Sequence, residues 1–234
     1  MTEDIVILTG AGISAESGLG TFRDVNGLWT RYDLEEVATP DGFARNPALV
    51  HEFYNTRRAN CRAATPNAAH LALARLEREG LGRVLVVTQN VDDLHERAGS
   101  RAVWHMHGRL ARALCAACGY RWDAPDFMDP QDTCPACAAH ATRPDVVWFG
   151  EYPHRMDEIW ERLRAATLFV AIGTSGQVYP AAAFVQDAGR AGARTLELNL
   201  EPSAGISDFD EARLGKASDL VPAWVAEVLA QAEP

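Results

Sequence analysis

The feature that most constrains the fold is an unbroken apolar run followed by a glycine-rich turn. Residues 5–8 are all apolar, as in a strand that is buried on both faces of a parallel sheet. The turn after them has the pattern Gly-x-Gly-x-x-Ala, in which Gly10 permits a tight turn and Gly12 permits backbone amides to approach a pyrophosphate. Glycine-rich turns in α/β proteins also occur without a ligand, so this motif alone leaves both interpretations open.

The chain departs from the standard dinucleotide-binding fingerprint after this turn. That fingerprint has an acidic residue about 20 residues after the glycines, at the end of a second strand. Residues 17–24 instead form a polar, glycine-containing stretch that includes Phe22 and Arg23. We therefore expect a nucleotide to be bound in an unusual way, with this loop folding over it.

Length and charge argue against several classes of protein. The 234 residues allow one large domain, or one domain with a small insert. The formal net charge of −10 disfavours direct binding of nucleic acid. No run of 18 apolar residues predicts a membrane-spanning helix, and the first strand begins by Ile5, too early for a signal or transit peptide. We expect a cytoplasmic protein without nucleic-acid or membrane partners.

Four of the five cysteines form two Cys-x-x-Cys pairs that are separated by 15 residues: Cys115, Cys118, Cys134 and Cys137. This spacing matches a zinc ribbon, in which four thiolates close a tetrahedral Zn²⁺ site without an open position for water. The metal would be structural, because residues 112–142 are too few to build a core alone. Paired disulfides or a redox dithiol are the alternatives. The fifth cysteine, Cys61, falls in a predicted helix and is expected to be inert.

A polar pair occupies the apolar stripe of a predicted helix. The helix starts at Asn46, a capping residue that is followed by proline. Its stripe continues through Tyr54, and Arg57 takes the next position of the same stripe. One interpretation is that Arg57 extends to solvent while Tyr54 packs. The other is a pocket for a carboxylate, because arginine offers two parallel donors and tyrosine a hydroxyl.

Polar or small residues follow three further predicted strands: residues 89–92 after the strand at 84–87, residues 173–176 after 168–172, and residues 199–202 at the end of 195–200. Ligands of open parallel sheets lie beyond the carboxyl ends of the strands, so these positions favour a nucleotide site. Asn90 and Asp92 have an alternative role as caps of a helix over 93–98.

The segment 103–108 carries two histidines. If it is extended, His105 and His107 share a face. Two close histidines suggest metal or base chemistry, whereas a structural histidine bonded to backbone is the alternative for either one.

The remaining segments are assigned from local signals. We predict a helix over 67–79 that is closed by Gly80, and a loop with a short helix over 22–45 that ends at a turn at 39–42. A strand and turn are predicted over 145–151, a helix over 180–191 and a final helix over 222–231.

Taken together, the motifs resemble those of the sirtuin family, in order and over essentially the whole chain. The segments that carry the resemblance are residues 10–18, 21–23, 88–92, 105–108, the four-cysteine ribbon, 149–151, 173–175 and 199–202. Tyr54 and Arg57 match the Tyr-x-x-Arg pair of class III sirtuins, which remove acidic acyl groups, and Ala38 matches the small residue of their wide acyl pocket. Leu34 stands where some of these relatives have alanine, and Gly20 where proline is frequent.

The resemblance implies an α/β fold, a Rossmann-like parallel sheet with helices on both faces, plus a small zinc-ribbon lobe and a helical insert. It implies a discontinuous NAD-binding domain of residues 1–29, 80–111 and 143–234. The helical insert would cover 30–79 and carry acyl-pocket residues, and the zinc-ribbon module would cover 112–142.

The resemblance also implies the activity, NAD-dependent removal of acyl groups from protein lysines. Nicotinamide and O-acyl-ADP-ribose would be released through an alkylimidate, with acetyl, succinyl and malonyl groups as substrates. His107 would be the general base, and His105 is interpreted as structural. The alternatives are a deacetylase without acidic-acyl preference, an ADP-ribosyltransferase that uses the same site, and a module that senses NAD⁺ without turnover.

The site residues follow from the matched motifs. The residues implied to bind NAD are Gly10, Ala11, Gly12, Ile13, Ser14, Phe22, Arg23, Gln89, Asn90, Val91, Asp92, Gly173, Thr174, Ser175, Asn199, Leu200, Glu201 and Ala217. The residues implied to bind the acylated peptide are Ala38, Tyr54, Arg57, Val147, Phe149, Gly150 and Val178. One structural zinc per chain and a monomeric state are expected.

Overall fold

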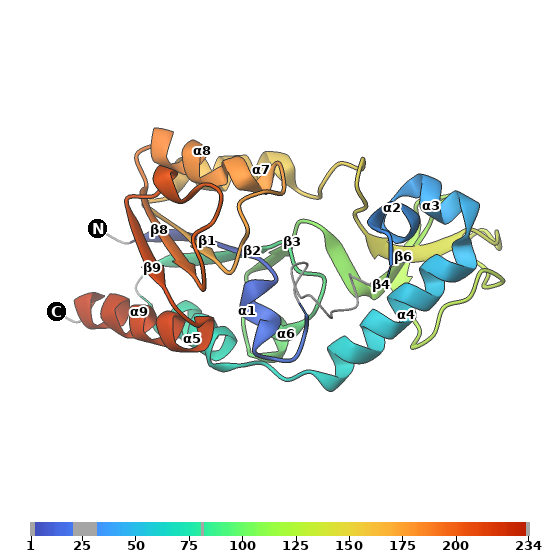
Figure 1. The fold of residues 1–234 in the computed structure, drawn as a ribbon, viewed down its shortest axis with the longest axis horizontal. Helices are drawn as coiled ribbons and strands as arrows, with labels where there is room; N and C mark the ends of the chain where they lie inside the picture. Colours follow the sequence, from blue (N-terminus) through green and yellow to red (C-terminus); the bar gives the residue numbers. More distant parts are fainter. Residues whose placement is uncertain (1–2, 21–31, 81, 233–234) are drawn as a thin grey trace.

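The computed structural model describes residues 3–20, 32–80 and 82–232, and the predicted cofactor residues Phe22 and Arg23 lie outside them. Its main sheet has six parallel strands in the order β3-β2-β1-β7-β8-β9 (Figure 1). These strands are β1 Asp4–Thr9, β2 Arg83–Thr88, β3 Val103–His105, β7 Leu168–Ile172, β8 Arg194–Asn199 and β9 Glu211–Leu214. The parallel α/β sheet is therefore confirmed.

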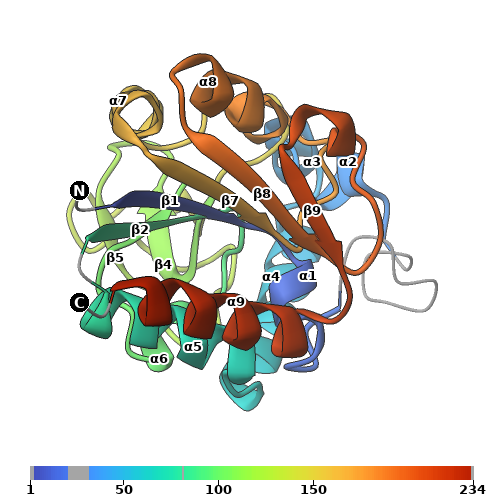
Figure 2. The ribbon, with the colours of Figure 1, turned by 90° about the vertical axis from the view of Figure 1, so that its left-hand side faces the viewer.

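The apolar run that opens the chain forms β1, in the middle of this sheet. All six of its residues are buried, and its four apolar residues alternate between two cores. Ile5 and Ile7 belong to one core, and Val6 and Leu8 to the other. Helices α5 Ala68–Glu79 and α9 Ala217–Ala232 cover the first face, and α7 Met156–Ala165 and α8 Phe184–Arg190 the second (Figure 2).

A second lobe lies beside the carboxyl ends of the first three strands (Figure 1). It combines an antiparallel sheet in the order β5-β4-β6 with three helices. Its elements are α2 Leu34–Val37, α3 Pro40–Arg45, α4 Pro47–Ala63, β4 Gly108–Cys115, β5 Arg121–Asp123 and β6 Thr142–Val146. Phe53 and Tyr54 of α4 pack in one core with Leu110 and Trp148, so the helical insert and the zinc-ribbon strands share a core. The domain boundaries given above stay a prediction.

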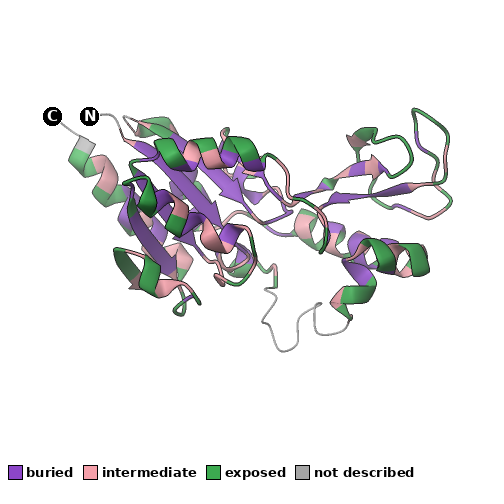
Figure 3. Cartoon of the chain, turned by 90° about the horizontal axis from the view of Figure 1, so that it is seen from above, coloured by how far each residue is buried: buried purple, intermediate pink, exposed green. Residues whose placement is uncertain are grey.

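Short helices complete the fold: α1 Gly12–Ala15, α6 Leu94–Arg97, and the 3₁₀ turns η2 Ala181–Ala183 and η3 Ile206–Asp208. Most strand residues of the main sheet are buried, whereas the helices around it expose their outer faces (Figure 3). Within the described ranges, no helix combines the length and apolar character needed to cross a membrane.

Two predicted helix starts are confirmed by their caps. The side chain of Asn46 accepts from the Leu49 amide at 3.1 Å, and Pro47 is the first residue of α4. Asn67 accepts from the Ala69 amide at 2.9 Å and begins α5, which Gly80 ends.

Several predicted boundaries were wrong. The segment 39–42 does not end a loop but begins α3, because Thr39 caps the Gly42 amide at 2.9 Å with Pro40 in the first turn. The final helix begins at Ala217 and not at Pro222, which lies inside it as the sixth residue and leaves one carbonyl of the helix without its usual amide donor. The strand predicted from residue 145 begins at Thr142, and the helix predicted over 180–191 begins as η2.

Strand β9 was missed by the sequence analysis. Its residues Glu211–Leu214 are mostly exposed and lack a continuous apolar run. It forms the edge strand of the sheet by pairing with β8. Its strand structure therefore depends on this long-range pairing and not on a local sequence pattern.

Candidate active site

Backbone hydrogen bonds hold the polar strand ends side by side. The Gly10 amide donates to the Ile172 carbonyl at 3.0 Å, and the Gly173 amide donates to the Leu198 carbonyl at 3.1 Å. The Gln89 amide donates to the Thr9 carbonyl at 2.9 Å. The loops after β1, β2, β7 and β8 therefore lie next to one another at the carboxyl ends of the strands.

The two glycine-rich loops touch through their backbones. The Gly12 amide donates to the Gly173 carbonyl at 2.9 Å. A Cβ added at Gly12 would lie 2.7 Å from the Gly173 Cα, and Gly173 has a φ of +61°. This packing is a reason for glycine at position 12 that the sequence interpretation did not include, and its role near a pyrophosphate stays a prediction.

Replacing Gly12 by alanine is expected to lower the free energy of unfolding by about 1–3 kcal/mol, because the new methyl group meets backbone that cannot move alone. Urea titration followed by circular dichroism measures it. Gly189→Ala is the control: this exposed position in α8 has its nearest neighbour 3.9 Å from an added Cβ, so alanine should leave stability equal or higher. Equal stability of Gly12→Ala and the wild-type protein would contradict the packing argument.

Asn90 and Asp92 form a network with the first loop. Asn90 Nδ2 donates to the Gly10 carbonyl at 3.0 Å and to Ser14 Oγ at 3.2 Å. Ser14 Oγ donates in turn to Asp92 Oδ2 at 3.2 Å. The other carboxylate oxygen of Asp92 accepts from the Leu94 amide at 3.1 Å, but the capping position of α6 belongs to Asp93 and not to Asn90 or Asp92. Burial raises the pKa of Asp92.

Two buried histidines behind this network were not identified from the sequence. His70 Nε2 lies 3.5 Å from Ser14 Oγ, and His95 Nε2 lies 3.0 Å from Thr9 Oγ1. Burial lowers the pKa of His70 to about 4 and that of His95 to about 3, so both rings are neutral near pH 7. Each occurs in a helix without a local motif, and no sequence signal would have connected them to the strand ends.

The two motif histidines do not share a strand face, because the segment 103–108 is not extended throughout. Strand β3 ends at His105, and His107 lies in the following turn. Their rings nevertheless bond to consecutive carbonyls, with His105 Nδ1 3.0 Å from the Asn90 oxygen and His107 Nδ1 3.2 Å from the Gln89 oxygen. His105 Nε2 also lies 2.8 Å from Glu96 Oε1, which supports its predicted structural role.

The bond to Gln89 fixes the form of the His107 ring. A carbonyl oxygen only accepts, so Nδ1 carries the hydrogen and Nε2 of the neutral ring is left as an acceptor. Burial lowers the pKa of His107 below its ordinary value of 6.5 and His154 lowers it further, while the bond to Gln89 opposes them. The lowered pKa keeps the ring near neutral pH in its neutral form, the form that a general base requires.

The loops after β7 and β8 contact each other at the carboxyl ends of their strands. Asn199 Nδ2 donates to the Thr174 carbonyl at 2.7 Å, and the Ala204 amide donates to the Ser175 carbonyl at 3.0 Å. Ala217 is the first residue of α9, and the Ser218 amide after it donates to Glu16 at 3.0 Å. These contacts bring the predicted residues of the C-terminal third close to the first loop, while Leu200 and Glu201 are exposed.

The predicted acyl-pocket residues gather between α4 and the segment after β6. Tyr54 is buried, and the guanidinium carbon of Arg57 lies 5.6 Å from the centre of its ring. The Ala38 carbonyl accepts from the Phe149 amide at 2.9 Å, and the Val147 amide donates to the His107 carbonyl at 2.9 Å. Burial lowers the pKa of Arg57 and raises that of Tyr54.

Two further residues of the predicted peptide site lie in loops. Gly150 has a φ of +89° in the turn after β6, and Val178 follows the β7 loop and accepts from the Ala182 amide at 2.9 Å. These two loops come from different parts of the chain.

The four paired cysteines form a candidate metal centre. Their sulfur atoms all lie within 4.8 Å of one another, with Cys115 and Cys137 3.7 Å apart and Cys118 and Cys134 3.7 Å apart. Four thiolates about 2.3 Å from a tetrahedral Zn²⁺ would be separated by about 3.8 Å, so the cluster fits this ion. All five cysteines are free, which excludes the disulfide alternative in this structure.

The remaining cysteine and a surface hollow lie apart from these sites. Cys61 lies on α4, where burial raises its pKa to about 12, in line with the expected lack of reactivity.

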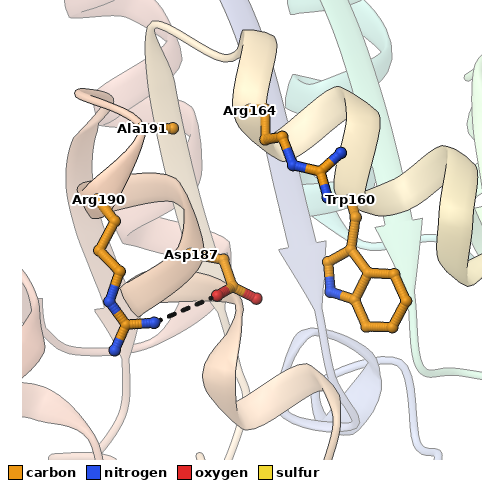
Figure 4. Close-up of a pocket in the computed structure, with 5 residues that line it drawn as sticks. All are labelled: Trp160, Arg164, Asp187, Arg190 and Ala191. Carbon is orange, nitrogen blue, oxygen red and sulfur yellow. Dashed lines mark ion pairs between the residues drawn. The ribbon is translucent and has the colours of Figure 1, made fainter.

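The hollow between α7 and α8 is lined by Trp160, Arg164, Asp187, Arg190 and Ala191 (Figure 4). It lies on the flank of the sheet and not at the carboxyl ends of the strands.

Fold and site together define an α/β nucleotide-binding protein with an attached zinc-binding lobe. Polar loops follow the carboxyl ends of the parallel strands, and the imidazole of His107, which has an acceptor nitrogen, lies beside them. The Sir2 family model matches residues 10–180, and the chain belongs to this family.

Similar proteins extend over nearly the whole chain. An NAD-dependent protein deacylase of Caulobacter vibrioides is 59% identical over 232 residues, covering 97% of each chain. An NAD-dependent protein deacylase of Leishmania major is 57% identical, covering 96% of this chain and 95% of its own. The solved structure of a Sir2 homologue with NAD has a TM-score of 0.91 at 39% identity, covering 98% of this chain and 90% of that one.

Proposed function

We propose that the protein is an NAD-dependent protein-lysine deacylase that accepts acidic acyl groups, succinyl and malonyl, as well as acetyl. Family membership and the relatives named above support the deacylase activity. Bound NAD⁺ supplies an electrophilic ribose carbon with nicotinamide as its leaving group. The residues of this chain position both reactants and accept a proton.

The strand-end loops fit an extended, polar cofactor. Residues 10–14 and 173–175 would face its phosphates and adenosine, residues 89–92 its nicotinamide and ribose, and residues 199–201 with Ala217 its adenosine end. Asn90 and Asp92 are held from behind by Ser14, so their positions are set before a ligand arrives.

The observation that carries the proposal is the orientation of His107. Its Nδ1 hydrogen is committed to the Gln89 carbonyl, so Nε2 would accept the proton of a ribose hydroxyl. The Val147 amide donates to the His107 carbonyl, which places the proposed peptide-binding segment with Phe149 and Gly150 next to the base. An extended peptide would add to this backbone as a strand, with Val178 on its other side.

Acidic-acyl preference rests on the Tyr54–Arg57 pair. Both side chains come from α4, with Ala38 in the same core and its carbonyl bonded to Phe149. A guanidinium and a phenol offer donors suited to a terminal carboxylate. We further propose a cytoplasmic monomer without nucleic-acid partners, in line with the net charge of −10, and without membrane partners.

The test compares acetyl, malonyl and succinyl peptides with NAD⁺ for wild-type protein and Arg57→Met. We expect kcat/KM for the acidic peptides to fall about a hundredfold, because a carboxylate would be buried without its charged partner, and the acetyl value to fall far less. Arg62→Met, which removes an exposed arginine of the same helix, is the control and should keep the wild-type ratio.

Equal losses on all three peptides would remove the argument for a carboxylate pocket. Mass spectrometry of the products separates deacylation from the alternative, since a target protein that gains ADP-ribose would indicate transferase activity instead.

A further inference from the structure

The hydroxyl of Tyr54 already accepts a hydrogen bond inside the protein. Trp148 Nε1 donates to it at 2.9 Å. Both side chains are buried, with exposed fractions of 1% for Tyr54 and 3% for Trp148, so water does not compete for this bond. Trp148 was assigned no role in the acyl pocket by the sequence analysis.

The indole of Trp148 is held on several sides. The guanidinium carbon of Arg143 lies 3.4 Å from the centre of its ring, and the ring of Phe43 lies 5.2 Å away. Glu151 accepts from both Arg143, at 2.7 and 2.9 Å, and the Trp148 amide, at 2.8 Å. The direction of the indole N–H is therefore fixed by packing and by the ion pair of Arg143 with Glu151.

This arrangement restricts what the phenol can do. An indole nitrogen only donates, whereas a phenolic oxygen both donates and accepts. The phenolic hydrogen lies in the plane of its ring, so an indole hydrogen on one side of the oxygen turns the O–H toward the other side. An oxygen that accepts from Trp148 thus presents its own hydrogen to whatever else enters the pocket.

We propose that Trp148 is a specificity-determining positioning residue, whose indole N–H orients the Tyr54 hydroxyl as a donor to the terminal carboxylate of an acidic acyl group. This inference rests on the proposed acidic-acyl activity. Arg57, on the same helix face, donates a side-chain hydrogen bond to Tyr54 and supplies the opposite charge. The Trp148–Tyr54 pair supplies the directed O–H donor.

The same geometry disfavours a short neutral acyl group. A methyl group offers no acceptor, so the buried Tyr54 O–H would keep its hydrogen without a partner when acetyl-lysine is bound. The orientation set by Trp148 therefore changes the ratio of kcat/KM between acidic and neutral acyl substrates, whereas a purely structural role would change both kcat/KM values alike.

The test is a double-mutant cycle of Trp148→Phe and Tyr54→Phe, read as the ratio of kcat/KM for succinyl and acetyl peptides. Phenylalanine at 148 keeps an aromatic ring under Arg143 but removes the N–H. We expect Trp148→Phe to lower the ratio about fivefold, mainly through KM for the succinyl peptide, and Tyr54→Phe about tenfold. In the Tyr54→Phe background, Trp148→Phe should change the ratio less than about twofold, because the hydroxyl on which it acts is gone.

The outcomes separate this inference from the proposed function. If the wild-type protein does not desuccinylate, the proposed acidic-acyl activity fails and the inference with it. If it does, and Trp148→Phe leaves the ratio unchanged or lowers it equally in both backgrounds, only the inference is overturned. Should Trp148→Phe fold poorly, site-specific replacement of Trp148 by benzothienylalanine, which keeps the fused ring but lacks the N–H, gives the same decision.

Discussion

Replacement of His107 by alanine is expected to lower kcat/KM about 10²–10⁴-fold, the range typical of a lost general base. The ring is held by its bond to the Gln89 carbonyl, and alanine offers neither the bond nor an acceptor nitrogen. Release of nicotinamide and of deacylated peptide, measured separately under single-turnover conditions, shows which step is lost. Cofactor affinity, measured by calorimetry, should change little.

The pH dependence gives a second readout of the same residue. A base acts only when neutral, and burial lowers the pKa of His107, so activity should be present above that lowered value and fall as the pH drops through it. The acid limb should therefore lie below pH 6.5. His154→Gln removes a neighbouring ring that lowers this pKa and should move the limb upward. An exposed histidine of the second lobe, His140, serves as control: its replacement by alanine should leave the limb in place.

An acid limb that stayed in place in His154→Gln would contradict the assignment of the limb to His107. Full turnover by His107→Ala would contradict the role of this imidazole altogether.

Removal of the metal is expected to unfold the strands around the four cysteines and to lower activity more than about tenfold. Segments of this size fold with their zinc, and apparent binding free energies in zinc-finger peptides are on the order of 10 kcal/mol. Strands β4 and β6 belong to the same core as Tyr54, so loss of the ribbon would disturb the acyl pocket without any contact between metal and substrate. Chelation followed by zinc analysis, hydrogen exchange and peptide assays measures the three effects.

Cys118→Ser and Cys61→Ser form a matched pair for this experiment. The first removes one of the four clustered sulfur atoms and should lower the zinc content, whereas the second removes a cysteine of α4 outside the cluster and should retain one zinc per chain. A metal-free protein with wild-type hydrogen exchange and turnover would show that the cluster has no structural role.

Local sequence signals were sufficient where one segment decides its own structure. The apolar run at 5–8 is a buried strand, Asn46 and Asn67 begin helices, and the cysteine spacing gives a cluster of zinc-like dimensions. In each of these cases the physical cause lies within a few residues, in burial, in a cap or in ligand spacing.

Local sequence signals did not predict every helix and strand correctly, in part because some of them depend on contacts with distant segments. Strand β9 exists because β8 offers an open edge. The start of α3 is different, since its cause is local and was misread: Thr39 caps the Gly42 amide, with Pro40 in the first turn. Pro222 lies inside α9, whose packing on α5 carries the helix through its first turns. Propensity is a small term beside the burial gained in tertiary contacts.

The sequence by itself determined the parallel sheet, the cysteine cluster and the residues gathered at the strand ends, because apolar periodicity and motif spacing are written along the chain. Only the tertiary structure decided which side chains and backbone groups from distant parts of the chain come into contact. Three kinds of contact join positions far apart in sequence: Gly12 on Gly173, the neutral rings of His70 and His95 beside Ser14 and Thr9, and the indole of Trp148 on the Tyr54 hydroxyl. Hydrogen bonds of this kind require directions that folding alone supplies.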